Sequence, residues 1–453
     1  MTSGAGTRKR LLLIIFDGLG DRPAPELGGK TPLEAAHTPN IDRLAREGIN
    51  GLVHAKSPGY ALGSPIALHL LFGYPEEQFP DRGPLLARAR GLAIAEDDIV
   101  LAARLSSGRR EGNRLRLVER FIDGREEACE ALAESIAEYE CDGLTFRYTY
   151  CGGGDGMLLI SGKASFGVTD TDPLALDLPV LRPQVRDDHA GEPSAARTAA
   201  ALERYLSWAH ARLRAHPAST ADRGANPINV LITKWAGPKP SLEPFVEKWG
   251  MRGASLPDEE VVSGIMMEMG FHMVEIRGQE PEIDLRTRLR ETRRLLDEGY
   301  EFIHLHTKYP DPMSHANEPE RCREAIEALD RAMASYWEEL ADDPNLVTVL
   351  TTDHTTPSVW GHVARGTFYD QHGGEPGPIA IRGGNVRVDG VTEYGERAVA
   401  SGGLGQLRGE DFMPVLLNAA ERTNMYEMRP TPVRRLYMPD EDGLDALEFA
   451  PDA

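Results

Sequence analysis

The hydrophobic positions of this chain include three short, continuous runs that each lead into acidic or imidazole side chains. Continuous apolar runs of this length are typical of strands buried on both faces, as in a parallel sheet. The runs and the polar residues that follow them are 11–16 with Asp17, 302–306 with Asp311 and His315, and 347–350 with Asp353 and His354. Ligands of open α/β sheets bind outside the carboxyl ends of such strands. The pattern therefore predicts a metal site at one sheet edge, and a metal site there indicates an enzyme.

Strand and helix patterns alternate along most of the chain, with one interruption. The alternation covers residues 11 to about 105 and resumes with a strand near 228–232. Between them the sequence predicts an acidic helix at 126–140, a linker or exposed loop at 183–197, and another helix at 199–216. We therefore predict an α/β fold with a doubly wound, mostly parallel sheet formed by residues 1–105 and 216–453. Residues 106–215 are predicted to form a smaller inserted α/β domain that caps the sheet edge.

Composition and charge narrow the possible partners. The chain has 453 residues, enough for about two or three domains. Its formal net charge of −21 argues against nucleic acid and anionic membranes as partners, because both would be repelled. The four cysteines have no CxxC spacing, which argues against structural zinc and against a disulfide framework. The apolar runs are too short for a membrane span or a signal peptide, so we expect a soluble, cytoplasmic protein.

The residues at the predicted sheet edge have the types and spacing of metal ligands. Asp311 and His315 lie one helical turn apart, close enough to share one ion. Asp353 and His354 are adjacent where a strand ends, and His372 lies in a glycine-containing loop. Oxygen and nitrogen ligands suit Zn²⁺ or Mn²⁺, and they fit Mg²⁺ alone less well. Two such ions would bind the attacking and leaving oxygens of a phosphoryl group.

Ser64, in the segment Leu62-Gly63-Ser64-Pro65, is the candidate nucleophile. A serine hydroxyl is a weak nucleophile at neutral pH, and metal coordination activates it. The helical stretch that follows would direct backbone amides at an anion. Taken singly, these features also have structural interpretations, because Ser64 and Asp17 suit helix caps and an Asp-x-x-x-His spacing occurs in many helices. Their joint occurrence at several strand ends favours a catalytic site.

Several longer motifs resemble those of archaeal-type cofactor-independent phosphoglycerate mutases, which belong to the alkaline phosphatase superfamily. The motifs flank the predicted insert on both sides, and their combination is specific for the family. They are FDGLGDRP at 16–23, LGGKTPLE at 27–34, TPNID at 38–42, LFGY at 71–74, RGP at 82–84, HTKYPD at 306–311, TDHTTP at 352–357 and GGLGQLRG at 402–409. The resemblance implies an alkaline-phosphatase-like sheet with an inserted cap domain.

Carried over residue by residue, the resemblance implies two divalent metal ions, with Mn²⁺ or Zn²⁺ expected and Mg²⁺ as a further option. One ion would bind Asp17, Ser64, Asp353 and His354, and the other Asp311, His315 and His372. Ser64 would be transiently phosphorylated, and Lys308 would stabilise the charge of the transferring phosphoryl group. The substrate-binding residues implied in this way are Arg82, Asp172 and Lys234.

The chain departs from the family pattern where substrate would bind. Phe166 and Gly167 replace an acid and an arginine, and Pro65 replaces the aspartate that follows the family's serine. Lys234 stands in place of an arginine, and lysine does not reproduce arginine's bidentate geometry. We therefore expect a phosphomutase with a diverged pocket that acts on a small phosphorylated or phosphonate acid. A metal-dependent phosphatase of the same superfamily, and a non-catalytic metal- or ligand-binding relative, are the alternatives.

Overall fold

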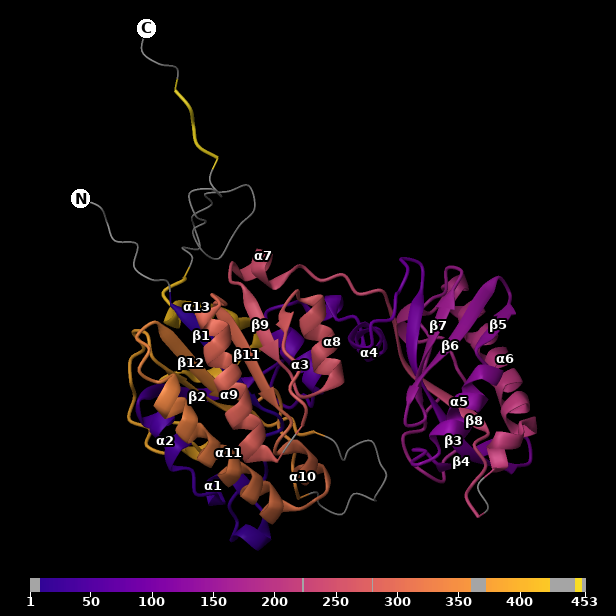
Figure 1. Ribbon diagram of the computed structural model, residues 1–453, viewed down its shortest axis with the longest axis horizontal. Coiled ribbons are helices and arrows are strands. Elements are labelled where there is room, and N and C mark those ends of the chain that lie inside the picture. The colour runs from indigo at the N-terminus through magenta and orange to yellow at the C-terminus, as the bar shows by residue number, and fades with distance from the viewer. Residues whose placement is uncertain (1–8, 222–223, 279, 360–371, 424–444, 450–453) are drawn as a thin grey trace. The chain divides into compact units, whose positions relative to one another are not determined.

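The computed structural model describes residues 9–221, 224–278, 280–359, 372–423 and 445–449, and Figure 1 shows its elements. The chain forms two compact units. Unit 2 is built from Pro80–Ser241, and unit 1 from the described residues on either side of that segment. All three apolar runs that lead into acidic or imidazole residues lie in unit 1.

Unit 1 is built around an eight-stranded sheet with the order β10-β9-β11-β1-β12-β13-β2-β14. β13 runs antiparallel to both of its neighbours, and the other neighbouring strands are parallel. The sheet is therefore mostly parallel, as the sequence predicted. Its strands are β1 Arg10–Phe16, β2 Gly48–His54, β9 Gly253–Leu256, β10 His272–Met273, β11 Phe302–Thr307, β12 Leu346–Thr351, β13 Gly377–Arg382 and β14 Gly405–Arg408.

The three apolar runs form neighbouring strands in the middle of this sheet. β1 pairs in parallel with β11 on one side and with β12 on the other, and Ile15 lies opposite both His306 and Thr351. Because the three strands are parallel and in register, their carboxyl ends meet at one edge of the sheet. The residues that follow them are therefore brought together, as predicted.

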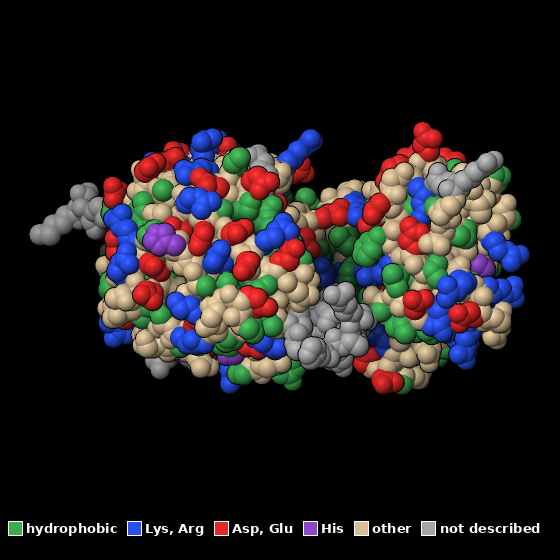
Figure 2. Space-filling model, turned by 90° about the horizontal axis from the view of Figure 1, so that it is seen from below, with side chains coloured by type: hydrophobic (Ala, Val, Ile, Leu, Met, Phe, Trp, Pro, Cys, Tyr) green, Lys and Arg blue, Asp and Glu red, His purple; other side chains and the backbone are tan. Residues whose placement is uncertain are grey.

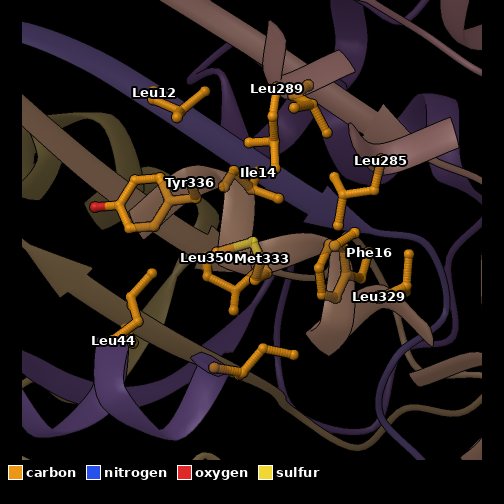
Figure 3. Packing of buried hydrophobic residues seen from close by; sticks show 14 of the residues in the cluster. Leu12, Ile14, Phe16, Leu44, Leu285, Leu289, Leu329, Met333, Tyr336 and Leu350 are labelled. Carbon is orange, nitrogen blue, oxygen red and sulfur yellow. The ribbon is translucent and has the colours of Figure 1, made fainter. Parts of the chain in front are cut away.

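Helices cover both faces of the sheet in unit 1. Figure 3 shows Leu12, Ile14 and Phe16 of β1 in the cluster formed with side chains of α2, α9 and α11. Successive side chains of a strand point to opposite faces, so the alternate residues meet another layer. On that side Phe72, which follows α3, contacts Phe302 of β11, with ring centroids 5.7 Å apart.

The helices of unit 1 are α1 Pro32–Ala35, α2 Pro39–Arg46, α3 Ser64–Leu71, α7 Phe245–Trp249, α8 Glu260–Glu268, α9 Pro281–Asp297, α10 Asp311–His315, α11 Pro319–Glu339, α12 Glu396–Val399 and α13 Gly409–Ala419, with 3-10 turns at Pro25–Leu27 and Glu76–Gln78. The start of α2 shows how tertiary contacts fix these elements. Asp330 of α11 accepts hydrogen bonds from the backbone N–H groups of Asn40 and Ile41, which no intrahelical carbonyl can satisfy. Among the described residues, no helix is both long enough and apolar enough to cross a membrane.

Unit 2 is an antiparallel sheet covered by helices. The strand order is β4-β3-β7-β6-β5, and β8 also pairs with β3. Phe146 of β6 stacks on Tyr205 of α6 in its core, with ring centroids 5.0 Å apart. The strands are β3 Ile99–Glu111, β4 Arg114–Glu119, β5 Glu138–Cys141, β6 Leu144–Gly152, β7 Asp155–Ser161 and β8 Val230–Pro238. The helices are α4 Arg82–Ala89, α5 Glu126–Ser135 and α6 Pro193–Ala215, with 3-10 turns at Asp187–His189 and Pro217–Thr220.

Unit 2 begins earlier and ends later than the insert expected at 106–215. The reason is the pairing of β3 with β8, which draws residues 99–106 and 230–238 into the second sheet. Two predicted elements are also corrected. The helix expected at 126–140 ends at Ser135, because Glu138–Cys141 pair with β6 as a strand. The helix expected at 199–216 begins at Pro193, inside the segment that was predicted to be a linker or loop.

Candidate metal centre

The carboxyl ends of β1, β11 and β12 place acidic and imidazole side chains on one face of the sheet. Phe16 belongs to the cluster with α9 and α11, so the next residue, Asp17, points to the opposite face. His306 and Asp353 lie on the same face as Asp17 by the same alternation along β11 and β12. The face that holds these three residues is the one covered by α3, which begins at Ser64.

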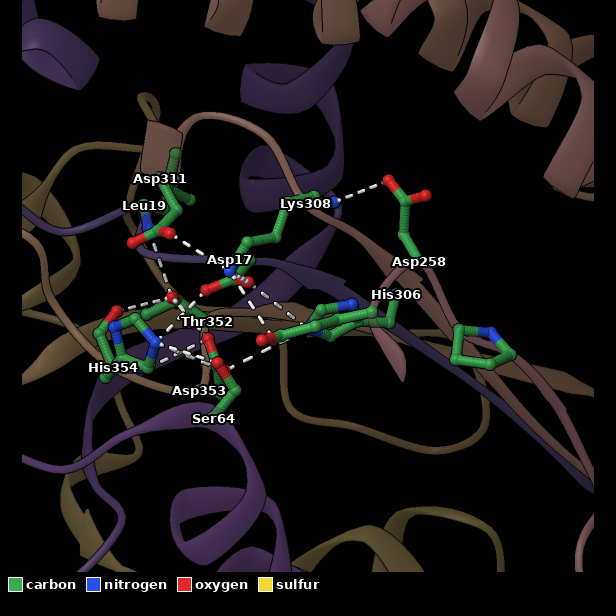
Figure 4. Close-up of polar contacts among 12 residues, drawn as sticks. Asp17, Leu19, Ser64, Asp258, His306, Lys308, Asp311, Thr352, Asp353 and His354 are labelled. Carbon is green, nitrogen blue, oxygen red and sulfur yellow. Dashed lines mark hydrogen bonds and ion pairs between the residues drawn. The ribbon is translucent and has the colours of Figure 1, made fainter. Parts of the chain in front are cut away.

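Ser64 and His354 meet at the centre of this site (Figure 4). The Ser64 hydroxyl oxygen lies 3.1 Å from His354 Nε2. The same nitrogen lies 3.1 Å from Asp17 Oδ1 and 3.5 Å from Asp353 Oδ2. All four side chains are buried. Four atoms of the kinds that bind divalent metals therefore converge from β1, α3 and the segment after β12.

A second group of three side chains lies beside the first. Asp311 Oδ1 lies 3.2 Å from His315 Nε2, across the single turn of α10, and 4.0 Å from His372 Nε2. The His372 ring stacks on His354 with centroids 3.8 Å apart, so the two groups are in contact. Thr356 donates a 2.7 Å hydrogen bond to Asp311 Oδ1 and fixes that carboxylate.

Lys308 lies between the two groups. Its ammonium nitrogen is 2.9 Å from Asp17 Oδ2, 3.0 Å from Asp311 Oδ2 and 3.4 Å from Glu259 Oε2. Its backbone N–H donates a 3.0 Å hydrogen bond to Asp258, which fixes the loop after β11 (Figure 4). A cation is thus held where two carboxylates approach each other, and this lowers their mutual repulsion.

The carboxyl groups of the site have strongly perturbed pKa values. Burial raises the pKa of Asp17, and the charges of Asp353 and Asp311 raise it further. Burial alone would also raise the pKa of Asp353, but His354, His306 and Lys308 together outweigh this effect and lower the pKa. For Asp311, the hydrogen bond with His315 and the charge of Lys308 outweigh burial, and its pKa is well below the ordinary value. Such crowded, buried carboxylates need positive charge nearby.

The imidazoles divide into two kinds. Burial would lower the pKa of His354, but Asp353 and Asp17 outweigh it and raise the pKa to about 9. Burial and the neighbouring charge of His354 lower the pKa of His372 to about 2, so this ring is neutral near pH 7. A neutral imidazole has the free lone pair that a metal ligand requires.

The side chains present fit a divalent metal. Within the described part of the chain, Asp17 Oδ1 and Asp353 Oδ2 are buried and make no hydrogen bond of good geometry, although Asp17 Oδ1 lies 3.1 Å from His354 Nε2. Both ring nitrogens of His306 are likewise buried without partners there. Buried polar atoms without partners are rare in proteins, and an ion would satisfy several of them at once. Oxygen and nitrogen atoms lie within 4.8 Å of one another in three groups: Asp311, His315 and His372; Asp17, Asp311 and His354; and Asp17, His306 and Asp353.

The structure thus brings together all seven residues predicted as metal ligands, together with Lys308. The three predicted substrate-binding residues lie in unit 2, where they form a cluster of their own. Arg120 donates hydrogen bonds of 2.6 and 3.0 Å to Asp172, and the Lys234 ammonium is 3.9 Å from the same carboxylate. Arg82 and Lys234 both lie over the Trp235 ring, at 4.5 and 3.7 Å from its centroid. This cluster carries more positive than negative charge, although the chain as a whole is acidic.

Two of the departures from the family pattern have a visible structural basis in unit 2. Phe166 packs edge-on against the ring of His189, with centroids 4.8 Å apart. A Cβ atom at Gly167 would come within 2.3 Å of His189 Cγ, so no larger residue fits there unless His189 moves. An arginine side chain is therefore excluded from position 167 by the surrounding structure as it stands.

Sequence reasoning missed several residues around the centre, of which His306, Glu259 and Thr356 are the clearest. His306 was recognised only as part of a motif. A usable signal was present, because His306 is a polar residue near the end of an apolar strand that leads to Asp311 and His315. Thr356 lay in the TDHTTP motif without being assigned a role, and Glu259 lay in none of the motifs. Only the tertiary fold brings Glu259 to Lys308 and Thr356 to Asp311.

Comparison with known proteins agrees with this geometry. Residues 9–419 match the model of the metalloenzyme superfamily. A 2,3-bisphosphoglycerate-independent phosphoglycerate mutase of Methanocaldococcus jannaschii is 34% identical over 97% of this chain and 100% of its own length. The corresponding enzyme of Pyrococcus furiosus is 34% identical over 92% of this chain and 99% of its own.

Two solved structures are similar over nearly the whole chain. A protein of Pyrococcus horikoshii superimposes with a TM-score of 0.74 at 28% identity, covering 93% of this chain and 100% of that one. A cofactor-independent phosphoglycerate mutase of Thermoplasma acidophilum gives a TM-score of 0.62 at 28% identity, covering 91% and 100%. The mixed α/β architecture with a large, mostly parallel sheet is therefore shared with solved relatives.

Proposed function

Because the chain belongs to the metalloenzyme superfamily and, within it, to the 2,3-bisphosphoglycerate-independent phosphoglycerate mutases, we propose that it transfers phosphoryl groups with two metal ions and a phosphoserine intermediate. In this proposal Asp17, Ser64, Asp353 and His354 bind one ion, and Asp311, His315 and His372 bind the other. When bound, the divalent ions polarise the phosphoryl oxygens and make the serine hydroxyl more acidic.

The observation that carries the proposal is the position of the Ser64 hydroxyl. It is buried at the first turn of α3, 3.1 Å from His354 Nε2, among carboxylate oxygens that have no hydrogen-bond partners. The N-cap position of α3 is taken by Gly63, so Ser64 is not the capping residue. Its hydroxyl lies beside the His354 ring instead. The placement supports a nucleophile better than a structural serine.

The chain's own groups would act as follows. Ser64 Oγ attacks phosphorus in line, the Oγ–P bond forms, and the bond from phosphorus to the leaving atom breaks. That atom is the ester oxygen of a phosphorylated acid or the carbon of a phosphonate, and the serine proton is passed on to it, directly or through water. Lys308 stabilises the charge on the transferring group from its position between Asp17 and Asp311. Return of the phosphoryl group to another hydroxyl of the bound intermediate completes a mutase cycle.

We propose that the substrate is a small phosphorylated or phosphonate acid, recognised by a diverged pocket. The cluster of Arg82, Arg120 and Lys234 supports an anionic group as the part that unit 2 binds. The loss of an arginine at position 167 and the lysine at 234 support a substrate different from 3-phosphoglycerate, since bidentate carboxylate contacts are lost.

Transfer to water instead of to substrate would make the protein a phosphatase, and the same residues would serve. A mutase must retain the dephosphorylated intermediate and exclude water until the phosphoryl group returns. Phe166 and Gly167, which depart from the family pattern, lie in unit 2, the unit proposed to retain the dephosphorylated intermediate. This change favours keeping a phosphatase as the second candidate function. The non-catalytic alternative is disfavoured by the complete set of ligand-type residues.

The test is phosphorus NMR of the Mn²⁺- or Zn²⁺-loaded protein with a panel of phosphorylated acids and phosphonates. We expect isomerised product for a mutase and inorganic phosphate for a phosphatase. Ser64→Ala should retain its metal and lose at least about a thousandfold in kcat. Ser401→Ala, at an exposed serine whose hydroxyl bonds a local carbonyl, is the matched control and should remain active. Turnover by Ser64→Ala would contradict the phosphoserine, and no turnover by the wild type on any substrate would favour the binding protein.

A further inference from the structure

His306 is a buried imidazole that the proposed mechanism does not yet use. Its side chain is fully buried, and neither ring nitrogen has a hydrogen-bond partner among the residues that the structure describes. Buried imidazoles ordinarily bond at least one carboxylate, carbonyl or hydroxyl, because leaving a polar atom without a partner is costly. His304, two residues earlier on the same strand, shows the ordinary arrangement, with Nδ1 2.9 Å from the Ser255 hydroxyl.

The distances around His306 Nε2 are those expected of atoms that share an ion. It lies 3.7 Å from Asp17 Oδ2 and 3.9 Å from Asp353 Oδ2 (Figure 4). These separations are too long for hydrogen bonds. Neighbouring ligand atoms of a four- or five-coordinate ion with bonds of about 2.1 Å lie roughly 3.0–3.4 Å apart, so a closure of less than about 1 Å would bring all three into coordination.

The position of His306 in the fold also suits a ligand. It lies in β11, paired with Ile15 of β1, two residues before Asp17. A side chain on a central strand of a packed sheet is held more rigidly than one on a loop, and such rigidity favours a defined coordination geometry. The neighbouring Lys308 does not compete for the nitrogen, because its ammonium is directed to the carboxylate oxygens of Asp17, Asp311 and Glu259.

We propose that His306 is a further ligand to the ion held by Asp17 and Asp353. The inference rests on the proposed metal centre and specifies one of its two ions. That ion would have two imidazole nitrogens, from His306 and His354, together with carboxylate oxygens. Nitrogen-rich sets of this kind favour Zn²⁺ and Co²⁺ over Mg²⁺, so the assignment also makes the enzyme dependent on a transition metal.

Asp17 Oδ2 can serve both Lys308 and an ion. A carboxylate oxygen has two lone pairs, so it accepts the 2.9 Å hydrogen bond from Lys308 with one and retains the other for coordination. The Lys308 charge then reduces the net negative charge of the ligand set without occupying the gap between Asp17, His306 and Asp353.

The experiment compares two substitutions on one strand, His306→Gln and His304→Gln, in the full-length protein. Zinc stoichiometry and affinity are measured with a competing chelator, and the fold is checked by circular dichroism and Tm. We expect two ions per chain in the wild type. His306→Gln should weaken one of them by at least about tenfold, and His304→Gln should leave both within about threefold. Crystals soaked in Zn²⁺ should show an anomalous peak within bonding distance of His306 Nε2.

If His306→Gln does not fold, His306→Asn, which is smaller and still polar, replaces it, and the crystal soak of the wild type decides independently. Unchanged affinity in the folded variant, or an anomalous peak that lies away from His306, would overturn the proposal. A third ion bound at His306 would overturn it as well, since the proposal assigns His306 to one of two ions. Phosphoryl transfer by the wild type is measured in parallel, so failure of this ligand assignment is separable from failure of the proposed function.

Discussion

Lys234 is the residue that we propose sets the substrate range of this protein. Its ammonium group lies against the Trp235 ring and 3.9 Å from Asp172. Burial lowers its pKa, the charge of Arg120 lowers it further, and Asp172 offsets only part of the effect, so that the pKa is about 8. Trp235 itself adopts a φ of 60°, a left-handed conformation that is uncommon for a bulky residue and often marks a functional site.

The Lys234 pKa leads to a prediction about pH. In the proposed pocket the protonated amine would attract an anionic substrate, and this charge is lost as the pH rises through about 8. The KM for a phosphorylated acid should therefore rise between about pH 7 and 9 in the wild type. Lys234→Arg should abolish that rise, because arginine stays charged, and should improve kcat/KM for 3-phosphoglycerate by about tenfold. Steady-state kinetics across this range provide the measurement.

Lys239→Arg is the matched control, because Lys239 is an exposed lysine paired with Glu96 in the same unit. Its substitution should leave the pH profile of KM unchanged. A flat profile in the wild type would show that Lys234 does not contact the substrate.

Most of the metal centre was predictable at the residue scale, and its surroundings were not. Asp17, Asp353 and His354 follow apolar strands directly, so their position at the sheet edge followed from the hydrophobic pattern. Glu259 lies 49 positions from Lys308 in the sequence, and no local pattern links the two. The packing of Phe166 on His189 is equally non-local.

At the scale of elements, α9 supports the loop that holds Lys308. Arg288 of α9 is completely buried, bonds Asp284 at 2.7 Å and Asp258 at 3.0 Å, and donates to the backbone carbonyls of Leu256 and Pro257. Asp258 in turn accepts the backbone N–H of Lys308. One buried guanidinium thus connects the helix, the end of β9 and the loop after β11.

Removing this guanidinium should be costly. Arg288→Met leaves Asp284 and Asp258 without their partner in the interior, and we expect a loss of about 3–5 kcal/mol in the free energy of unfolding. Arg293→Met, which removes an exposed ion pair with Asp297 on the same helix, should cost less than about 1 kcal/mol. Urea unfolding of both variants measures the difference. Equal effects would mean that the buried network does not stabilise the helix.

The pattern of elements was predicted well where burial dictated it and poorly where pairing did. Residues 11–16 are apolar throughout because both faces of β1 are covered, so the strand was evident from the sequence. Glu138–Cys141 follow α5 without a strong break in the pattern, and only pairing with β6 makes them a strand. Local propensity is a weak guide where tertiary contacts of this kind decide.

At the scale of the whole molecule, the candidate metal ligands are confined to one of the two units. The net charge of −21 is large, and on the face shown in Figure 2 acidic and basic side chains are interspersed over both units. The three groups of metal-ligand-type side chains all belong to unit 1. Binding of divalent ions should therefore stabilise one unit selectively.

Calorimetry tests this expectation. Adding Mn²⁺ or Zn²⁺ to the chelator-treated protein at about a hundred times the Kd should stabilise unit 1 by about 2.7 kcal/mol for each ion, or about 5.4 kcal/mol for the two proposed ions. The unfolding transition of unit 2 should not move, so the two units should separate in temperature. Asp311→Asn, which removes a ligand and keeps the side-chain size, should reduce the shift. A rise of both transitions together would show that the two units unfold as one.

The sequence alone determined the fold class, the three central strands and the residue types at their ends, because burial of a parallel strand on both faces leaves an unbroken apolar run. It also determined the family, through motifs that flank unit 2. Only the tertiary structure decided the extent of unit 2, the network around Lys308 and the isolation of His306 among carboxylates. The physical reason is that these depend on which side chains meet across long sequence separations, and hydrophobic periodicity reports burial but not the identity of the neighbour.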